Sequence, residues 1–251
     1  MKLKNLLDLI KEIQEKKNTS PVFICGGIPR DKVLNILDKI EDLDLTTGDH
    51  TISTIYNYVN AAFKRKYKIV SKERPGGHQT LELGNLKVDF SSNFKLPNIK
   101  EILHGMNVKN STNLVEEMYS RDFNCNSLLL TLDLKSVLDP TNKGMIDIKN
   151  KIVDTILEPQ LTLMGHKYTN RVVRSIYIAS KLDFSISPRV VDFIKNKPEI
   201  LLTVKAKTIE EKLSKSMFYD KDKTIYYINT MGLWRFLPKS EVMMNLFPGK
   251  L

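Results

Sequence analysis

Two stretches decide the fold: Phe23-Ile24-Cys25-Gly26-Gly27-Ile28-Pro29-Arg30-Asp31 and, shortly after it, Glu41-Asp42-Leu43-Asp44-Leu45. In the first, an apolar run ends at two glycines and the chain restarts with Pro29. This pattern predicts a strand, a tight turn and a helix, because proline is well tolerated in the first helical turn. Such a turn directs free backbone N–H groups at an anion, most often a phosphate.

The second stretch alternates acidic and apolar residues, as a strand with one buried face does. Asp42 and Asp44 would then project from one face, roughly 7 Å apart, while Leu43 and Leu45 enter the core. Adjacent carboxylates repel each other unless a divalent cation bridges them, and hard oxygen ligands suit magnesium. Either motif alone is common in proteins without this chemistry. Together, a phosphate-binding turn and a metal-binding acid pair indicate nucleotidyl transfer.

Length and composition predict an ordinary globular chain. With 251 residues, 41% of them hydrophobic, it can bury a core as one domain or two closely packed ones. No apolar run approaches the ~20 residues of a membrane helix, and the N-terminus lacks a secretory signal pattern. Two cysteines cannot form a disulfide framework. We therefore expect a cytoplasmic protein that does not engage a membrane.

The chain carries a formal net charge of +10. Such an excess predicts a polyanionic partner, although lysine-rich surfaces also serve solubility. Basic residues cluster between positions 167 and 197 and, earlier, in a group that we expect to bind an RNA backbone: Lys64, Arg65, Lys66, Lys68 and Arg74.

A third acid follows in a predicted hairpin. Gly84-Asn85 separates two alternating runs, and Leu86, Val88 and Phe90 share one face, so Asp89 lies on the opposite face together with Lys87. An acid on the polar face of a strand is often merely solvated. Of the segments nearby, residues 32–40 are expected to continue the helix after the glycine turn, and residues 92–118 to form a loop leading into a short helix.

Several blocks resemble the class II family of CCA-adding enzymes and poly(A) polymerases, which are polymerase-beta-like nucleotidyltransferases. One of them, Leu138-Asp139-Pro140, resembles the stretch in which the family head closes onto its neck. The first two resemble its GGxVRD and DxD elements, with Pro29 in place of valine. Ser120-Arg121-Asp122-Phe123-Asn124-Cys125-Asn126 resembles RRDFTIN, with Ser120 replacing an arginine. Asn170-Arg171-Val172-Val173-Arg174-Ser175-Ile176 resembles part of EDPLRILRAI, whose acid falls on Tyr168.

This resemblance implies an α+β head, with a small mixed sheet and helices in the nucleotidyltransferase fold, over residues 1–150. An all-α neck and truncated body would follow over residues 151–251, select the base and bind RNA. The long tail of cellular family members would be missing.

The resemblance also implies roles for individual residues. Asp42, Asp44 and Asp89 would hold two magnesium ions and act in catalysis. The nucleotide would be bound in three places: the triphosphate by Gly26, Gly27 and Arg30; the ribose and phosphates by Arg121, Asp122 and Asn126; and the base by Arg171, with Tyr168 and Arg174 beside it.

The implied reaction is transfer of nucleotides from ATP and CTP to an RNA 3′ end, by default CCA addition to tRNA. Addition of poly(A) or shorter oligonucleotides remains an alternative, because Tyr168 departs from the base-selecting pattern. A catalytically silent RNA-binding protein on the same fold is a second alternative. The three acids argue against it, since such a protein has no need for mutually repelling carboxylates.

Overall fold

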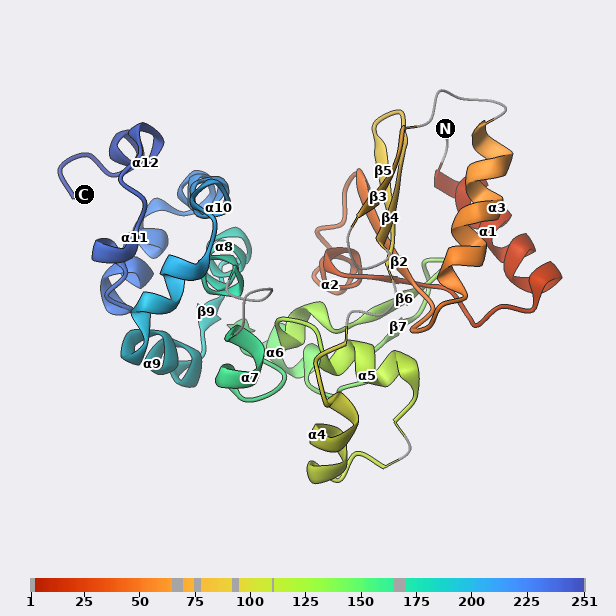
Figure 1. Cartoon of the computed structure of the whole chain (residues 1–251), viewed down its shortest axis with the longest axis horizontal. Coiled ribbons are helices and arrows are strands. Elements are labelled where there is room, and N and C mark those ends of the chain that lie inside the picture. Colours follow the sequence, from red (N-terminus) through yellow and green to blue (C-terminus); the bar gives the residue numbers. More distant parts are fainter. Residues whose placement is uncertain are drawn as a thin grey trace. The chain divides into compact units, whose positions relative to one another are not determined.

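The computed structural model describes residues 3–64, 70–74, 78–91, 95–109, 111–164 and 170–250, with the side chains of Glu73 and Arg74 excluded. The chain divides into two compact units (Figure 1). The first contains Met1–Arg121 and Asn126–Met145, and the second Asp122–Cys125 and Ile146–Leu251.

A mixed sheet forms the centre of the first unit, with strand order β3-β4-β5-β2-β1-β6-β7. Strands β2 and β5 run parallel, and the other neighbouring pairs described in this sheet are antiparallel. The strands are β1 (Phe23–Cys25), β2 (Asp42–Thr46), β3 (Val70–Arg74), β4 (His78–Leu83), β5 (Leu86–Phe90), β6 (Leu129–Thr131) and β7 (Val137–Leu138).

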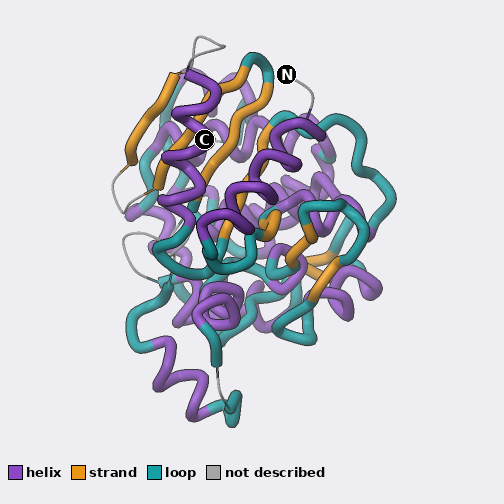
Figure 2. The backbone as a smooth tube through the Cα atoms, turned by 90° about the vertical axis from the view of Figure 1, so that its right-hand side faces the viewer, coloured by secondary structure: helices purple, strands orange, loops and turns teal. Residues whose placement is uncertain are grey.

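Helices α1 (Leu3–Lys17) and α3 (Ile52–Lys64) cover one face of this sheet (Figures 1 and 2). Each helix repeats apolar residues at helical spacing, which gives it one apolar stripe to bury. The strands alternate, so every second side chain meets those stripes. The resulting core contains fully buried side chains from both helices and from the sheet, including Leu6, Ile10, Ile24, Leu43, Leu45, Ile55, Val88 and Phe90.

The remaining helices of the first unit are short: α2 (Gly27–Val33), α4 (Ile99–Gly105) and α5 (Asn113–Tyr119). The expected helix over residues 32–40 is wrong beyond Val33, because Asn35 takes a left-handed backbone conformation (φ 56°) that ends the helix. The expectation of a loop and one short helix over 92–118 is also wrong, since this stretch holds both α4 and α5.

The second unit is predominantly helical. Its α-helices are α6 (Gly144–Asn150), shared across the unit boundary, α7 (Pro159–Leu163), α8 (Arg171–Leu182), α9 (Pro188–Asn196), α10 (Ala206–Tyr219), α11 (Lys221–Thr230) and α12 (Glu241–Leu246), and its short 3₁₀ helices cover Asn124–Asn126, Pro198–Thr203 and Trp234–Phe236.

The predicted class, an α+β head followed by a helical body, is confirmed with one correction. The second unit is not purely helical, because β8 (Ile152–Val153) and β9 (Ser185–Ile186) pair in parallel. Within the described part of the chain, no helix has the length and apolar character needed to cross a membrane.

Candidate active site

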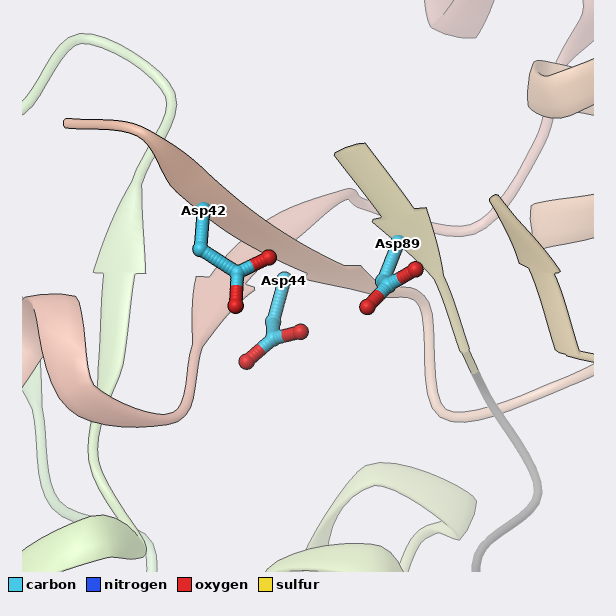
Figure 3. Close-up of side chains that lie close together, drawn as sticks. All are labelled: Asp42, Asp44 and Asp89. Carbon is cyan, nitrogen blue, oxygen red and sulfur yellow. The ribbon is translucent and has the colours of Figure 1, made fainter. Parts of the chain in front are cut away.

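The parallel pairing of β2 and β5 brings three carboxylates together. Asp44 lies opposite Asp89 in the register, and Asp42 precedes Asp44 by two residues on the same face. Leu43 and Leu45 of β2 are fully buried on the face of the sheet that α1 and α3 cover, so the acids point to the opposite face. Asp42, Asp44 and Asp89 each offer an oxygen within 4.8 Å of the others, and Figure 3 shows the three side chains converging.

Gly26 lets the glycine turn approach this acid cluster. A Cβ on Gly26 would lie 2.6 Å from Asp44 Oδ2, closer than van der Waals contact allows, and its φ of 78° is one that side chains disfavour. Both facts require glycine at this position. The predicted turn therefore lies directly against the predicted metal-binding acids.

The electrostatics of Asp44 fit a cation-binding role. Burial raises the pKa of the Asp44 carboxyl above its ordinary value; the charges of Asp42 and Asp89 raise it further, while the Arg121 guanidinium opposes them. A divalent ion would relieve this penalty, and three hard carboxylate oxygens are ligands that magnesium accepts.

Two neighbouring side chains contact the acids. Lys87 lies opposite Asp42 in the register, and its Nζ donates to Asp42 Oδ1 at 2.9 Å and to Asp89 Oδ2 at 2.5 Å. Thr80, on β4, donates its hydroxyl to Asp89 Oδ1. Each oxygen of Asp89 therefore accepts a hydrogen bond, one from the neighbouring strand β4 and one from its own strand β5.

The structure brings Arg30 and Asn126 together, although they lie far apart in the sequence. Arg30 is buried, and its Nη1 donates to Asn126 Oδ1 at 2.5 Å while its Nη2 pairs with Asp31 at 2.6 Å. The arginine thus links the start of α2 to the segment after Arg121. Its predicted contact with the triphosphate stays a prediction.

Arg121 lies in a buried polar network under the acid strand. Its Nη2 pairs with Glu117 Oε1 at 2.6 Å and donates to Cys25 Sγ at 3.0 Å. Glu117, fully buried on α5, also accepts a hydrogen bond from the Thr46 hydroxyl at 2.6 Å. Burial raises the pKa of the Cys25 thiol to about 12, so this cysteine stays neutral beside Arg121.

In the second unit, Asp122 and Arg174 form an ion pair, with Arg174 Nε 2.6 Å from Asp122 Oδ2. Arg171 is buried at the start of α8, and its Nη1 donates to the carbonyl oxygen of Thr162 at 2.9 Å. Tyr168, the remaining predicted base contact, lies outside the described residues.

Of the predicted RNA-binding patch, Lys64 ends α3 with an exposed side chain. Arg74 ends β3, and its side chain is not among those described. The other three members, Arg65, Lys66 and Lys68, lie outside the described residues. The patch therefore stays a prediction.

Sequence reasoning missed three residues of the site: Lys87, Thr80 and Glu117. The alternation that placed Asp89 on the polar face also placed Lys87 there, so the contact between Lys87 and Asp89 could have been predicted. Glu117 gave no signal, because its partners are Thr46 on β2 and Arg121, which follows α5.

Residues 22–154, just over half of the chain, match the family model described as poly A polymerase head domain. The tRNA nucleotidyltransferase cca2 of Schizosaccharomyces pombe is 26% identical over 85% of this chain and 45% of its own length. The CCA-adding enzyme of Levilactobacillus brevis is 23% identical over 86% of this chain and 51% of its own length. The chain thus spans about half the length of these curated relatives.

Among solved structures, the CCA-adding enzyme of Thermotoga maritima, complexed with tRNA, superposes with a TM-score of 0.70 at 20% identity, covering 92% of this chain and 51% of that chain. At this identity the likeness shows the fold alone. The family match, however, contains the glycine turn, all three acids and the segment around Arg121. The chain therefore belongs to the family of poly(A) polymerases and CCA-adding enzymes.

Proposed function

We propose that the protein is a template-independent RNA nucleotidyltransferase that adds nucleotides from NTPs to an RNA 3′ end, with CCA addition to tRNA as its reaction. The observation that carries this proposal is the convergence of Asp42, Asp44 and Asp89 within 4.8 Å beside the glycine turn. Support for tRNA as substrate comes from the names of relatives, which are tRNA nucleotidyltransferases and CCA-adding enzymes.

In the proposed reaction, the RNA 3′ oxygen forms a bond to the α-phosphorus of the nucleotide, the α–β phosphoanhydride bond breaks, and pyrophosphate leaves. Asp42, Asp44 and Asp89 would hold two magnesium ions. Bound divalent ions supply positive charge at the attacking and leaving oxygens. Asp89 would also accept the proton of the attacking hydroxyl.

The head, residues 1–150, would bind the triphosphate through Gly26, Gly27 and Arg30 and the ribose through Arg121, Asp122 and Asn126. The helical part, residues 151–251, would select the base through Tyr168, Arg171 and Arg174. RNA would lie on the basic segment from Lys64 to Arg74. A cytoplasmic location suits Cys25 and Cys125, which are buried free thiols.

The test incubates purified protein with tRNA lacking its CCA end, magnesium and each labelled NTP singly, then with CTP and ATP together. CCA addition predicts incorporation of CTP alone and of ATP only once CTP has been added. Incorporation of ATP alone on any RNA would instead identify a poly(A) or oligo(A) polymerase. Binding of RNA without any incorporation would leave a silent RNA-binding protein and refute the proposal.

A further inference from the structure

Helices α8 and α10 of the second unit carry a strip of aromatic rings and cations that the proposed function does not use. Tyr177 and Tyr219 lie edge to face with ring centroids 6.1 Å apart, and Phe218 continues the series at 5.5 Å from Tyr219. Lys212 Nζ lies 5.0 Å from the centre of the Tyr177 ring. Rings and a cation thus form one continuous surface across two packed helices.

The outer end of this strip is strongly exposed. Phe218 is 83% and Tyr219 47% accessible to water, although both belong to a well-formed helix whose opposite face is buried. A phenylalanine this exposed gains nothing for folding. The neighbouring Tyr219 ring stands at 78° to it, so the two rings offer separate exposed faces rather than one flat surface, and Phe218 is the more exposed of the two.

The inner end of the strip is positively charged. Burial, and then the charges of Arg174 and Lys215, lower the pKa of Lys212, and they outweigh the opposing effects of Glu211 and Asp122. Lys212 and Lys215 lie three residues apart on α10, and Lys212 lies over the Tyr177 ring. Alternating exposed rings and cations is the pattern by which proteins hold single-stranded nucleic acid, with bases on the rings and phosphates at the cations.

We propose that the strip formed by Tyr177, Lys212, Lys215, Phe218 and Tyr219 binds an unpaired stretch of RNA, with a base stacked on Phe218. The proposal rests on the proposed function for the identity of the nucleic acid. It adds a second RNA contact, separate from the segment between Lys64 and Arg74.

The test measures binding of a fluorescein-labelled oligoadenylate by anisotropy. We expect Phe218→Ala to weaken binding about tenfold, and Phe218→Trp to keep the affinity and show tryptophan quenching when RNA is added. Lys215→Gln should lower the slope of log affinity against log salt by about one. Tyr226→Ala is the matched control, because Tyr226 is 59% exposed on α11 but pairs with Tyr227 outside the strip.

Unchanged affinity in Phe218→Ala would overturn this proposal, as would a change in its oligomeric state without a change in RNA affinity, which would mark a protein interface. The anisotropy assay measures RNA binding and does not require nucleotide incorporation. A wild type that binds oligoadenylate through Phe218 but incorporates no nucleotide would refute the proposed function and leave the strip intact.

A second inference concerns Lys87 and the metal site of the proposed function. Its place opposite Asp42 and two residues before Asp89 is set by strand register, so its ammonium reaches both carboxylates. The Lys87 side chain is 32% exposed and that of Asp89 16%, so water screens their contact only partly. A fixed positive charge therefore shares the oxygens that would bind a divalent ion.

We infer that Lys87 is a positioning residue that weakens divalent-ion binding in the nucleotide-free protein, so that the ion enters with the nucleotide. A cation at this distance repels an incoming ion, while the nucleotide's phosphates attract both and would draw the ammonium away from the carboxylates. Without Lys87, the three acids would bind the ion ahead of the nucleotide.

The test titrates the nucleotide-free protein with Mn²⁺ and follows free Mn²⁺ by electron paramagnetic resonance. Lys87→Met should raise the Mn²⁺ affinity on the order of tenfold, and a non-hydrolysable ATP analogue should raise it further in the wild type than in the variant. Lys87→Arg keeps the charge and should behave as the wild type. Lys72→Met is the matched control, since Lys72 pairs with Glu82 in the same sheet. Equal Mn²⁺ affinities for wild type and Lys87→Met would overturn this role.

Discussion

The three acids and the four arginines assigned to the site differ in how they are held. Asp42, Asp44 and Asp89 project from adjacent strands, and their oxygens face one another. Each arginine contacts an acceptor group: Arg30 contacts Asn126, Arg121 contacts Glu117, Arg174 contacts Asp122 and Arg171 contacts the carbonyl of Thr162.

This difference separates a feature that only function explains from features that folding explains equally well. Clustered carboxylates cost free energy in the folded protein, whereas a buried arginine paired with an acid satisfies the needs of the fold. The acids are therefore direct support for chemistry. For each arginine, experiment must separate a structural role from contact with the nucleotide.

The largest expected effect concerns the acids. Asp42→Asn or Asp44→Asn should lower nucleotide incorporation by roughly a thousandfold or more, because each removes a charged metal ligand worth several kcal/mol in the transition state. Single-turnover incorporation measures this. Asp38→Asn is the control, since Asp38 is an exposed acid shortly before the same strand. Near-normal turnover in either acid variant would remove these residues from catalysis.

The next effect concerns Arg121. Arg121→Met should lower the free energy of unfolding by about 3–5 kcal/mol, since it strands the buried Glu117 carboxylate without its cation. The double variant Arg121→Met/Glu117→Gln should recover most of that loss, because the amide can still bond Thr46. Urea unfolding measures both. If the stable double variant is also fully active, Arg121 serves only the fold.

A smaller effect concerns base choice. Arg171→Lys keeps the charge but loses the planar guanidinium group. It should raise the activation free energy for incorporation of the preferred nucleotide by ~1–3 kcal/mol. Single-turnover rates with all four NTPs measure it, with Arg174→Lys as the comparison. Four rates that fall in their original ratios would show that Arg171 does not read the base.

The smallest effect is on stability against pH. Because the Asp44 pKa is raised in the folded protein, the folded state holds this proton more tightly than the unfolded chain. The free energy of unfolding should therefore fall as the pH rises from the ordinary carboxyl pKa through the raised pKa of Asp44. Above the raised pKa, the ionised carboxylate destabilises the fold to its full extent. Asp44→Asn should remove that penalty and gain about 1 kcal/mol at neutral pH.

Thermal unfolding of the metal-free protein between about pH 4 and about pH 8 checks this prediction. The wild type should lose stability over the lower part of that range, and Asp44→Asn should not. Parallel curves for the two proteins would show that ionised Asp44 does not destabilise the fold. The argument that the acid cluster costs free energy would then fail.

The acids could be predicted from the sequence because strand alternation is local. Leu43 and Leu45 fixed the face of Asp42 and Asp44, and Leu86, Val88 and Phe90 fixed that of Asp89. Alternation could not give the parallel pairing of β2 with β5, which is a long-range choice; the family resemblance implied only that the three acids share one site in a small mixed sheet.

The contacts of the arginines within the fold, and the short helices, could not be predicted for a different reason. Arg121 meets Glu117 and Cys25 only once α5 lies against the sheet, and residues 92–118 show no period because α4 and α5 are each only seven residues long. The end of α2 at Val33 depends on the conformation of Asn35, for which apolar spacing gives no signal.

The parallel pairing of β2 and β5 also bears on how the protein folds. A parallel pair cannot form through a tight hairpin, so β2 must wait until α3, β3 and β4 have been laid out before β5 reaches it. Closing that long loop is entropically slow, and such contacts form late. A chain in which β2 and β5 have not yet paired therefore lacks the acid cluster, so the proposed metal site depends on one of the last contacts of the sheet to form.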